Sequence, residues 1–164
     1  MIRPVPTECP PGTTWRALMS LAFDEACAAA REGEVPVGAV LVDAKGQVLA
    51  RAHNSVVGLS DPTAHAELLC LRQAGLALGN YRLSGSILVV TLEPCLMCVG
   101  ALVHARVAGV VFASPDPKAG ALVSNLDAAA LPFLNHRPWV LQGVLDENGS
   151  ALLKRFFLAR RKPL

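Results

Sequence analysis

Thr91-Leu-Glu-Pro-Cys-Leu-Met-Cys98 is the stretch that decides how this chain is interpreted. A continuous apolar run leads into it, so the stretch should lie where a strand gives way to a helix. Pro94 suits the start of a helix, because the N–H that proline lacks has no partner there. Cys95 and Cys98 would share the first turn, where free N–H groups favour thiolates and the two sulfurs converge. Taken alone, Cys-x-x-Cys leaves open a metal site, a redox pair or two buried thiols.

A second stretch, Asp61-Pro-Thr-Ala-His-Ala-Glu67, narrows these alternatives. Asp61 can cap a helix with Pro62 at its first position, which places His65 within two turns of the helix N-terminus. One histidine and two cysteines with an open fourth position are typical of a catalytic zinc ion rather than a closed structural one. Glu67 would add a carboxylate beside the metal that is not a ligand. His-x-Glu followed by Pro-Cys-x-x-Cys is the known pattern of zinc-dependent base deaminases.

The composition is that of one folded domain. The chain has 164 residues, of which 52% are hydrophobic, so it can bury a sizeable core. Charged residues make up only 17%, which excludes a wholly disordered chain. Five cysteines are an odd number, and two belong to the metal pattern. Cys9, Cys27 and Cys70 lack a paired spacing, so we expect free thiols and a cytoplasmic protein.

The N-terminal residues and the helical segments carry no targeting or membrane signal. Residues 1–12 are rich in proline and lack an apolar signal segment, so we expect a disordered extension before a single domain at 13–164. The most apolar helical segment, 17–30, contains Asp24 and Glu25, and we therefore expect no membrane span.

Charge is distributed unevenly along the chain. The formal net charge is +2, but no acidic residue follows Glu147. Five basic residues lie in that last segment: Lys154, Arg155, Arg160, Arg161 and Lys162. On charge alone such a segment is more often a solvated helix face than a contact to nucleic acid.

Hydrophobic periodicity and turn residues predict the order of the elements. We expect helices over 14–31, 62–78, 95–104 and 147–160, a helical turn near Asp127, and strands over 35–42, 47–52, 86–91, 107–112 and 139–144. The long loop 114–121 contains proline and glycine, and unstructured loops of this length are often functional. This order predicts a three-layer α/β/α sandwich with a mixed five-stranded sheet.

From about Trp15 to Arg161 the chain resembles the bacterial tRNA-specific adenosine deaminases, within the cytidine deaminase-like superfamily. Beyond the metal pattern, the matching stretches are Glu34-Val-Pro-Val-Gly-Ala-Val-Leu-Val42, Asn54, Asn80-Tyr-Arg-Leu83, Asp116-x-Lys118, Asn135-His-Arg137 and Phe156-Phe-x-x-Arg-Arg161. The last three look specific to the tRNA enzymes. The chain departs from the family at Pro115, where the family often has an arginine, and this removes a charge and stiffens the loop.

The resemblance implies a cytidine deaminase-like fold, a homodimer and hydrolysis of adenosine to inosine at the wobble position of a tRNA anticodon loop. It implies one Zn²⁺ per subunit, held by His65, Cys95 and Cys98, with Glu67 as the catalytic residue. The implied substrate contacts are Asn54, which would hold the target base, and Asp116, Lys118, Asn135 and Arg137, which would contact flanking nucleotides.

The chemistry of such a site gives the two nearby glutamates different roles. Zinc lowers the pKa of its water to about 7, and the resulting nucleophile would attack C6 of adenine. Glu67 would take the water's proton, pass it to N1 and protonate the departing amine. Glu93 lies just before the Pro-Cys turn, so we expect it to accept backbone N–H groups at the helix start.

Two alternatives remain. A deaminase of a free base or nucleotide, such as guanine or cytosine, would share the zinc pattern but would not need the basic last helix or the 135–137 motif. A structural zinc module that binds RNA would need a fourth protein ligand and would have no use for Glu67.

Overall fold

The computed structural model describes residues 4–6 and 8–160. Its helices are α1 (Trp15–Arg31), α2 (Ala66–Leu78), α3 (Leu96–His104) and α4 (Asp146–Arg160), with a short 3₁₀ helix, η1 (Ala128–Ala130). Its strands are β1 (Gly38–Val42), β2 (Val48–His53), β3 (Ile87–Leu92), β4 (Gly109–Ser114) and β5 (Trp139–Gln142). Each predicted element is present, and most bounds differ from the prediction by one to three residues.

The five strands form one mixed sheet with the order β2-β1-β3-β4-β5. β1 is antiparallel to both β2 and β3, whereas β3, β4 and β5 are parallel. The carboxyl ends of β3 and β4 therefore meet at one edge of the sheet, which is where ligands usually bind in open α/β sheets.

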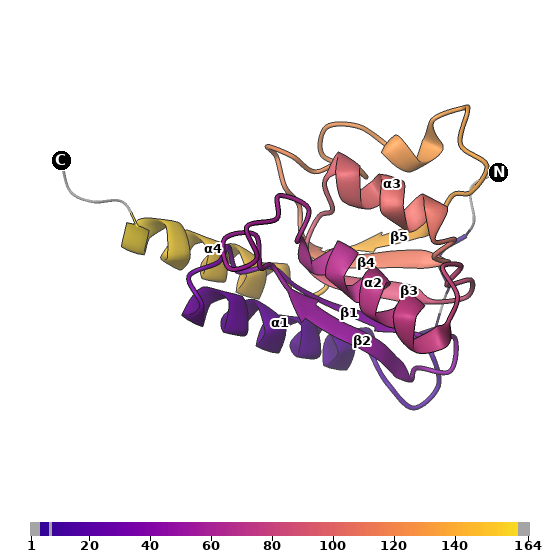
Figure 1. The fold of residues 1–164 in the computed structure, drawn as a ribbon, viewed down its shortest axis with the longest axis horizontal. Helices are drawn as coiled ribbons and strands as arrows, with labels where there is room; N and C mark the ends of the chain where they lie inside the picture. Colours follow the sequence, from indigo (N-terminus) through magenta and orange to yellow (C-terminus); the bar gives the residue numbers. More distant parts are fainter. Residues whose placement is uncertain (1–3, 7, 161–164) are drawn as a thin grey trace.

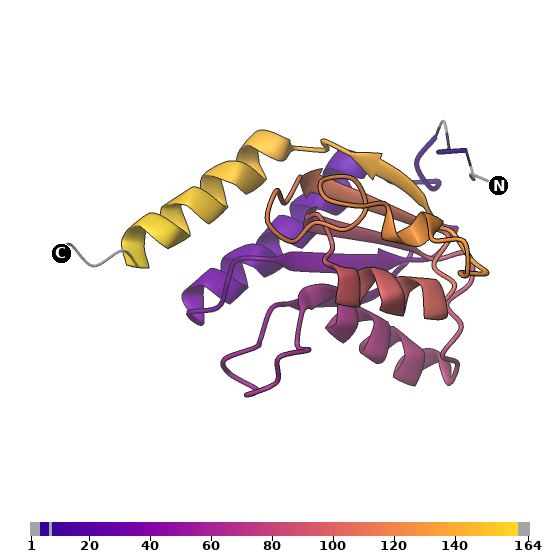
Figure 2. The same ribbon diagram turned by 90° about the horizontal axis from the view of Figure 1, so that it is seen from above.

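Helices cover both faces of this sheet (Figures 1 and 2), with α1 and α4 on one side and α2 and α3 on the other. The first core contains Met19, Val40, Val89 and Val111. The second contains Leu41, Leu88, Val110 and Phe112. Successive residues of the central strands thus enter opposite cores, which explains why these strands are apolar without alternation. The predicted three-layer sandwich is confirmed.

α1 packs closely against the sheet. Thr14 caps this helix as predicted, because its Oγ1 accepts the Ala17 N–H at 3.1 Å. A Cβ at Gly38 would overlap the backbone of Ala22 and Ala26, so this contact requires glycine.

The described part of the predicted N-terminal extension ends against the domain. Pro10 is buried, and Cys9 packs against the core on the α1 side of the sheet. Residues 1–3 and 7 lie outside the described residues, so the disorder predicted for residues 1–12 stays a prediction. Within the described ranges, no helix is both long enough and apolar enough to span a bilayer.

Candidate active site

The two cysteines lie at the junction between β3 and α3. Cys95 is the N-cap residue of α3, and Cys98 follows within the first turn. Their sulfur atoms are 3.7 Å apart, which confirms the predicted convergence. Pro94 precedes the N-cap instead of taking the first helical position, because the backbone of Cys95 is still extended (φ −75°, ψ 171°).

The structure corrects the predicted start of α2. The helix begins at Ala66, with His65 as its N-cap residue. Asp61 closes a separate turn, because its Oδ1 accepts both the N–H and the hydroxyl of Thr63 at 2.7 Å. The Asn54 side chain caps the helix instead, since its Oδ1 accepts the Ala66 N–H at 2.9 Å. His65 thus lies at the very entrance of α2, where its ring reaches the α3 cysteines.

The three candidate ligands have the spacing of a zinc site. His65 Nδ1 lies 3.7 Å from Cys95 Sγ and 3.6 Å from Cys98 Sγ. Tetrahedral zinc with Zn–S of about 2.3 Å and Zn–N of about 2.0 Å requires edges of about 3.8 Å between sulfurs and about 3.5 Å between sulfur and nitrogen. The three atoms therefore occupy three corners of a zinc tetrahedron and leave the fourth corner for water or substrate.

The cysteine pair already favours a thiolate. The pKa of Cys95 is lowered to about 4, mainly by a hydrogen bond with Cys98 and also by one with His65. Burial opposes this shift but does not outweigh it. The pKa of Cys98 is raised, first by the same hydrogen bond and second by burial. The pair thus holds one proton, on Cys98, which a bound cation would displace.

Glu67 is a buried carboxylate with an unsatisfied oxygen. It lies in the first turn of α2 and is 3% exposed. Among the described residues, its Oε2 is the only buried side-chain nitrogen or oxygen atom without a hydrogen-bond partner. Burial raises the pKa of Glu67, and the neighbouring His65 opposes this rise. Such an orphaned acceptor is costly unless a water or ligand satisfies it, so it fits a water in the open fourth position.

These groups open into a cavity of about 380 Å³. Its lining includes His65, Glu67 and Cys95 together with two predicted substrate residues, Asn54 and Asp116. A larger groove of about 790 Å³ lies between α2 and α3, but its lining is mostly apolar and contains none of the metal ligands. The smaller cavity is therefore the candidate active site, because it contains the ionisable side chains of His65, Glu67 and Cys95.

Three of the five predicted substrate residues lie in or beside this cavity. Asn54 has its oxygen engaged with Ala66, so its NH₂ group is the part that can contact a base. Asp116 turns the loop after β4, because its Oδ1 accepts the Lys118 N–H at 2.9 Å. Lys118 itself is exposed on that loop.

Asn135 and Arg137 are not brought to the cavity. They precede β5, whose first residue, Trp139, pairs with Gly109 at the end of the sheet away from the cysteines. Asn135 accepts two hydrogen bonds from the Arg106 guanidinium, at 2.7 Å and 3.1 Å. Arg137 forms an ion pair with Asp127.

Two charged residues, Glu34 and Arg160, lie in the cavity wall, a position that the sequence did not predict for them. Glu34 is buried, and its Oε1 accepts the Gly58 N–H at 2.7 Å. Arg160 reaches the cavity from α4, donates to the Gly33 carbonyl and lies 4.3 Å over the Phe156 ring. The basic composition of the last segment was the available signal for Arg160, but only the fold places that segment beside the active site. Arg161 and Lys162 lie outside the described residues.

Glu93 differs from its prediction. Its carboxylate accepts N–H groups of the loop after β4, at Asp116 and at residues 122–124, instead of those at the start of α3. The loop returns across the Pro-Cys turn, and this long-range approach has no local sequence signal.

The fold and the site define a class of protein. Residues 13–114 match the family model for the cytidine and deoxycytidylate deaminase zinc-binding region. This agrees with the predicted cofactor, zinc, and with the three residues that fit it.

Individual relatives give a narrower assignment. The chain is 45% identical over 144 residues to the tRNA-specific adenosine deaminase of Bacillus subtilis, which covers 88% of this chain and 89% of the relative. It is 43% identical over 145 residues to that of Haemophilus influenzae, with 88% and 84% covered. A structure solved in studies of A-to-I editing by tRNA:A34 deaminases superposes with a TM-score of 0.81 at 43% identity, over 83% of this chain and 98% of that chain. The chain belongs to the tRNA-specific adenosine deaminase family.

Proposed function

We propose that this protein is a zinc-dependent hydrolase that converts adenosine to inosine at the wobble position of a tRNA anticodon loop. The observation that carries this proposal is the buried, unsatisfied Glu67 oxygen beside a three-ligand metal site, in a chain 45% identical to a tRNA-specific adenosine deaminase. A closed structural zinc module would show a fourth protein ligand and no orphaned carboxylate.

In this proposal Glu67 carries the protons. When bound, zinc would lower the pKa of a water to about 7 and so supply a nucleophile near neutral pH. Glu67 takes one proton from the attacking water and delivers it to N1 of adenine. It then takes the remaining proton of the hydroxyl added at C6 and passes it to the amino group, which leaves C6 as ammonia while the C6 carbonyl of inosine forms. Burial supports this role, because it raises the pKa of Glu67 and so favours transient protonation.

Asn54 and the loop after β4 hold the target nucleotide in this proposal. The Asn54 NH₂ group can donate to the base, since the Asn54 oxygen is fixed by Ala66. Asp116 lies on the wall of the same cavity, and Lys118 is exposed beside it. A base can enter only when it leaves its stack, and an anticodon loop presents such bases.

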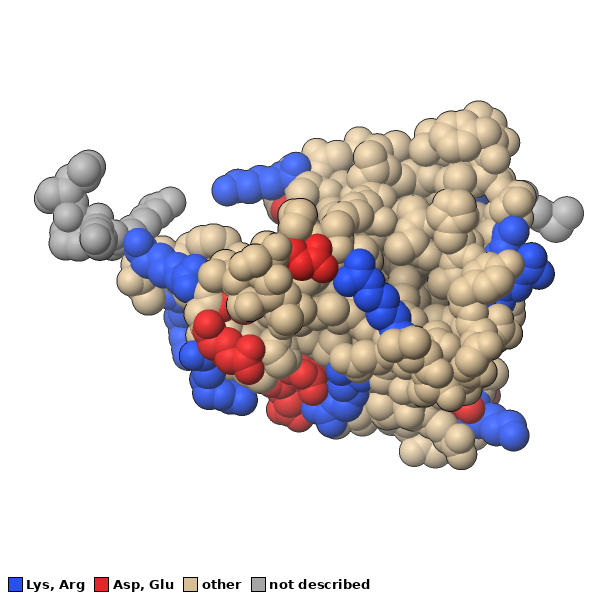
Figure 3. Space-filling view, viewed as in Figure 1, with Lys and Arg blue, Asp and Glu red and all other residues tan. Residues whose placement is uncertain are grey.

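Basic side chains around this cavity supply the contacts to phosphate. Arg160 lies on the cavity wall, and Lys154 and Arg155 are exposed on the same helix, α4. Figure 3 shows Lys and Arg atoms gathered toward the end of α4. Contacts from Asn135 and Arg137 remain part of the proposal, and they would be to nucleotides outside the cavity.

We also propose that the protein is a homodimer, as the family resemblance implies. The groove between α2 and α3 is lined largely by apolar side chains, and at its rim Leu76 is 85% exposed and Tyr81 is 71% exposed. The face over these helices carries few charged side chains (Figure 3). Light scattering should give twice the mass of one chain for the wild type and a smaller mass for Leu76→Asp. A monomeric wild type would refute the proposal.

The expected compartment is the cytoplasm, the site of tRNA maturation and a reducing environment. All five cysteines lie within the described residues and are free thiols, which suits such a compartment.

The test of the proposed function is a comparison of substrates. The purified zinc enzyme is offered a short anticodon stem-loop with adenosine at the wobble position, and separately adenosine, adenine, guanine and cytosine. We expect inosine in the stem-loop and little turnover of the free compounds. Efficient turnover of a free base without turnover of the stem-loop would replace the proposal with a small-molecule deaminase.

A further inference from the structure

One carboxylate beside the metal site is saturated with hydrogen bonds from a single loop. Glu93 lies two residues before Cys95 and is 3% exposed. Its Oε1 accepts three successive backbone N–H groups, from Leu122 at 3.0 Å, Val123 at 2.7 Å and Ser124 at 2.9 Å. Its Oε2 accepts the N–H of Asp116 at 3.1 Å and the hydroxyl of Ser124.

The arrangement is an anion-binding nest whose occupant is a side chain of the same chain. Successive N–H groups directed at one point create a concave site that favours negative charge. Hydrogen bonds to a charged acceptor are stronger than those between neutral groups, and five of them converge on Glu93. The two ends of the loop 116–124 are therefore tied to one carboxylate.

Backbone contacts join the same loop to the metal-binding turn. Ala121 donates its N–H to the Pro94 carbonyl at 3.0 Å, and Gly120 forms an isolated β-bridge with Cys95. A Cβ at Gly120 would overlap the Glu93 carboxylate, so the loop can pack against this side chain only because residue 120 is glycine.

The far end of this loop forms part of the active-site wall. Asp116 and Ala119 line the cavity that also contains Asn54 and Glu67. Because the Asp116 N–H is bound to Glu93, the position of this wall relative to the metal turn is set by the Glu93 side chain.

We infer that Glu93 is a positioning residue for substrate binding: it holds the loop 116–124 on the metal-binding turn and thereby sets the affinity for the nucleotide in the cavity. This inference rests on the proposed function for the identity of that nucleotide. It gives Glu93 no part in proton transfer, since both of its oxygens are engaged by the loop.

The test separates binding from chemistry. Glu93→Gln keeps the side-chain volume but replaces one acceptor oxygen with an NH₂ group that faces N–H donors. We expect one zinc per chain, a KM for the anticodon stem-loop raised about tenfold or more, since several charge-assisted bonds are removed, and a kcat within about threefold. Hydrogen exchange at the amides of residues 116–124 should become faster. A residue that only stabilises the fold would not raise KM while kcat and the zinc content stay nearly unchanged.

Asp43→Asn is a matched control. Asp43 is also a carboxylate that accepts two backbone N–H groups, from Lys45 and Gln47, but it lies in the β1–β2 turn and does not line the cavity. We expect an unchanged KM for this variant. Ser124→Ala removes a single donor and should raise KM in the same direction by a smaller factor, which keeps the test available if Glu93→Gln does not fold.

An unchanged KM in Glu93→Gln and Ser124→Ala, or a loss confined to kcat, would overturn the inference. Wild-type turnover of the stem-loop, measured in the same experiment, tests the proposed function separately. If the wild type prefers a free base, the comparison of KM values is made on that base.

Discussion

Two glutamates beside the metal site are equally buried but have opposite surroundings. Glu67 and Glu93 are both 3% exposed, and each lies two residues from a metal ligand in sequence. The Oε2 atom of Glu67 has no hydrogen-bond partner among the described residues, and burial raises its pKa. Burial also acts to raise the pKa of Glu93, but hydrogen bonds from the Ser124 hydroxyl and from backbone N–H groups lower it overall.

The difference shows that burial alone does not define a catalytic carboxylate. Hydrogen bonds that favour the charged form keep Glu93 an anion, whereas Glu67 retains a free acceptor that can take a proton. A cation bound at the adjacent cysteines would pull the Glu67 pKa back down, and this would favour release of the proton to substrate. Environments that separate the pKa values of two like groups also separate their roles.

Loss of the bound metal ion should have the largest effect, because the proposed proton transfer by Glu67 depends on that ion. Cys98→Ala deletes one of three ligands that lie 3.6–3.7 Å apart. We expect zinc well below one per chain and no measurable turnover. Elemental analysis after gel filtration checks this, with Cys70→Ala as a control cysteine outside the site. Stoichiometric zinc in Cys98→Ala would exclude Cys98 as a ligand.

A methyl group at Gly120 should disturb the surroundings of Glu93 and leave those of Glu67 unchanged. The new Cβ would overlap the Glu93 carboxylate and lie 2.6 Å from the Asp116 carbonyl. Overpacking of this kind costs about 1–3 kcal/mol, so Gly120→Ala should lower the melting temperature and raise KM while zinc is kept. Gly100→Ala is the control, because a Cβ there has no neighbour within 4 Å. Wild-type KM in Gly120→Ala would separate the loop from substrate binding.

A smaller effect is expected where α4 meets the cavity. Arg160→Ala removes a guanidinium from the cavity wall, and Arg161, outside the described residues, can be replaced with it. RNA binding should weaken, and the slope of log K against log salt should fall by about 1 for each phosphate that the variant no longer neutralises. Turnover at saturating RNA should change little. An unchanged slope would mean that the replaced arginine side chains do not bind phosphate.

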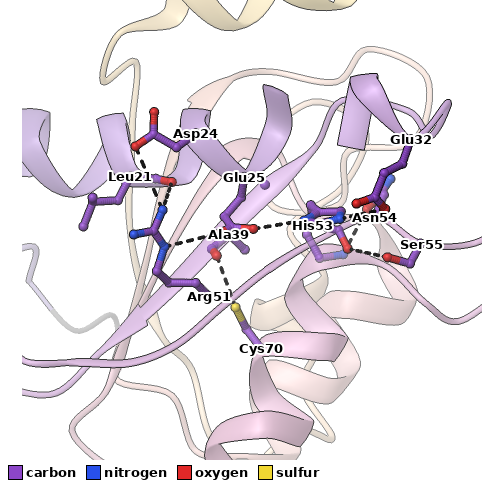
Figure 4. Close-up of polar contacts among 12 residues, drawn as sticks. Leu21, Asp24, Glu25, Glu32, Ala39, Arg51, His53, Asn54, Ser55 and Cys70 are labelled. Atoms are coloured by element: carbon purple, nitrogen blue, oxygen red, sulfur yellow. Dashed lines mark hydrogen bonds and ion pairs between the residues drawn. The ribbon is translucent and has the colours of Figure 1, made fainter. Parts of the chain in front are cut away.

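The smallest effect concerns a third group of carboxylates, those that contact His53 (Figure 4). Its Nδ1 lies 2.9 Å from Glu25 and its Nε2 lies 3.2 Å from Glu32, both on or next to α1, while Arg51 and Asp24 complete the cluster. Burial lowers the His53 pKa, but the two glutamates outweigh it, so the pKa is raised. The stabilisation is thus present below the unfolded pKa of about 6.5 and is lost as pH rises through the higher folded value.

We therefore expect His53→Gln to lower the melting temperature more at pH 6 than at pH 9. The free-energy difference at pH 6 should be about 1 kcal/mol or less, because the pairs are partly exposed. Thermal unfolding at both pH values is the measurement. A loss that is equal at both pH values would show that packing, not charge, accounts for the contribution of His53.

The sequence predicted features that depend on neighbouring residues, and it failed where a contact comes from a distant part of the chain. Cys95 and Cys98 were predictable because their spacing alone places both sulfurs on one helical turn. The start of α2 was misplaced because Asp61 carries a strong capping signal, whereas the residue that caps the helix, Asn54, is twelve positions away from Ala66. Local patterns identify ligands, but they do not identify partners brought by another strand.

Long-range contacts account for the other differences. Glu93 was expected to bind the helix beside it, but it binds a loop about thirty residues later. The family resemblance grouped Asn135 with the substrate contacts, yet the parallel order of β3, β4 and β5 places it at the opposite end of the sheet from the cysteines. Sheet topology decides these positions, and single motifs carry no information about it.

The most direct test of the account compares the two glutamates under identical conditions. Glu67→Gln and Glu93→Gln are each loaded with zinc and assayed in single turnover at saturating anticodon stem-loop. We predict that Glu67→Gln keeps zinc and loses at least about 10²–10⁴-fold in rate, because proton transfer by a positioned group is worth that much. Glu93→Gln should stay within about threefold of the wild type. A rate near wild type for Glu67→Gln, or a loss in Glu93→Gln that equals it, would contradict the assignment of the proton carrier.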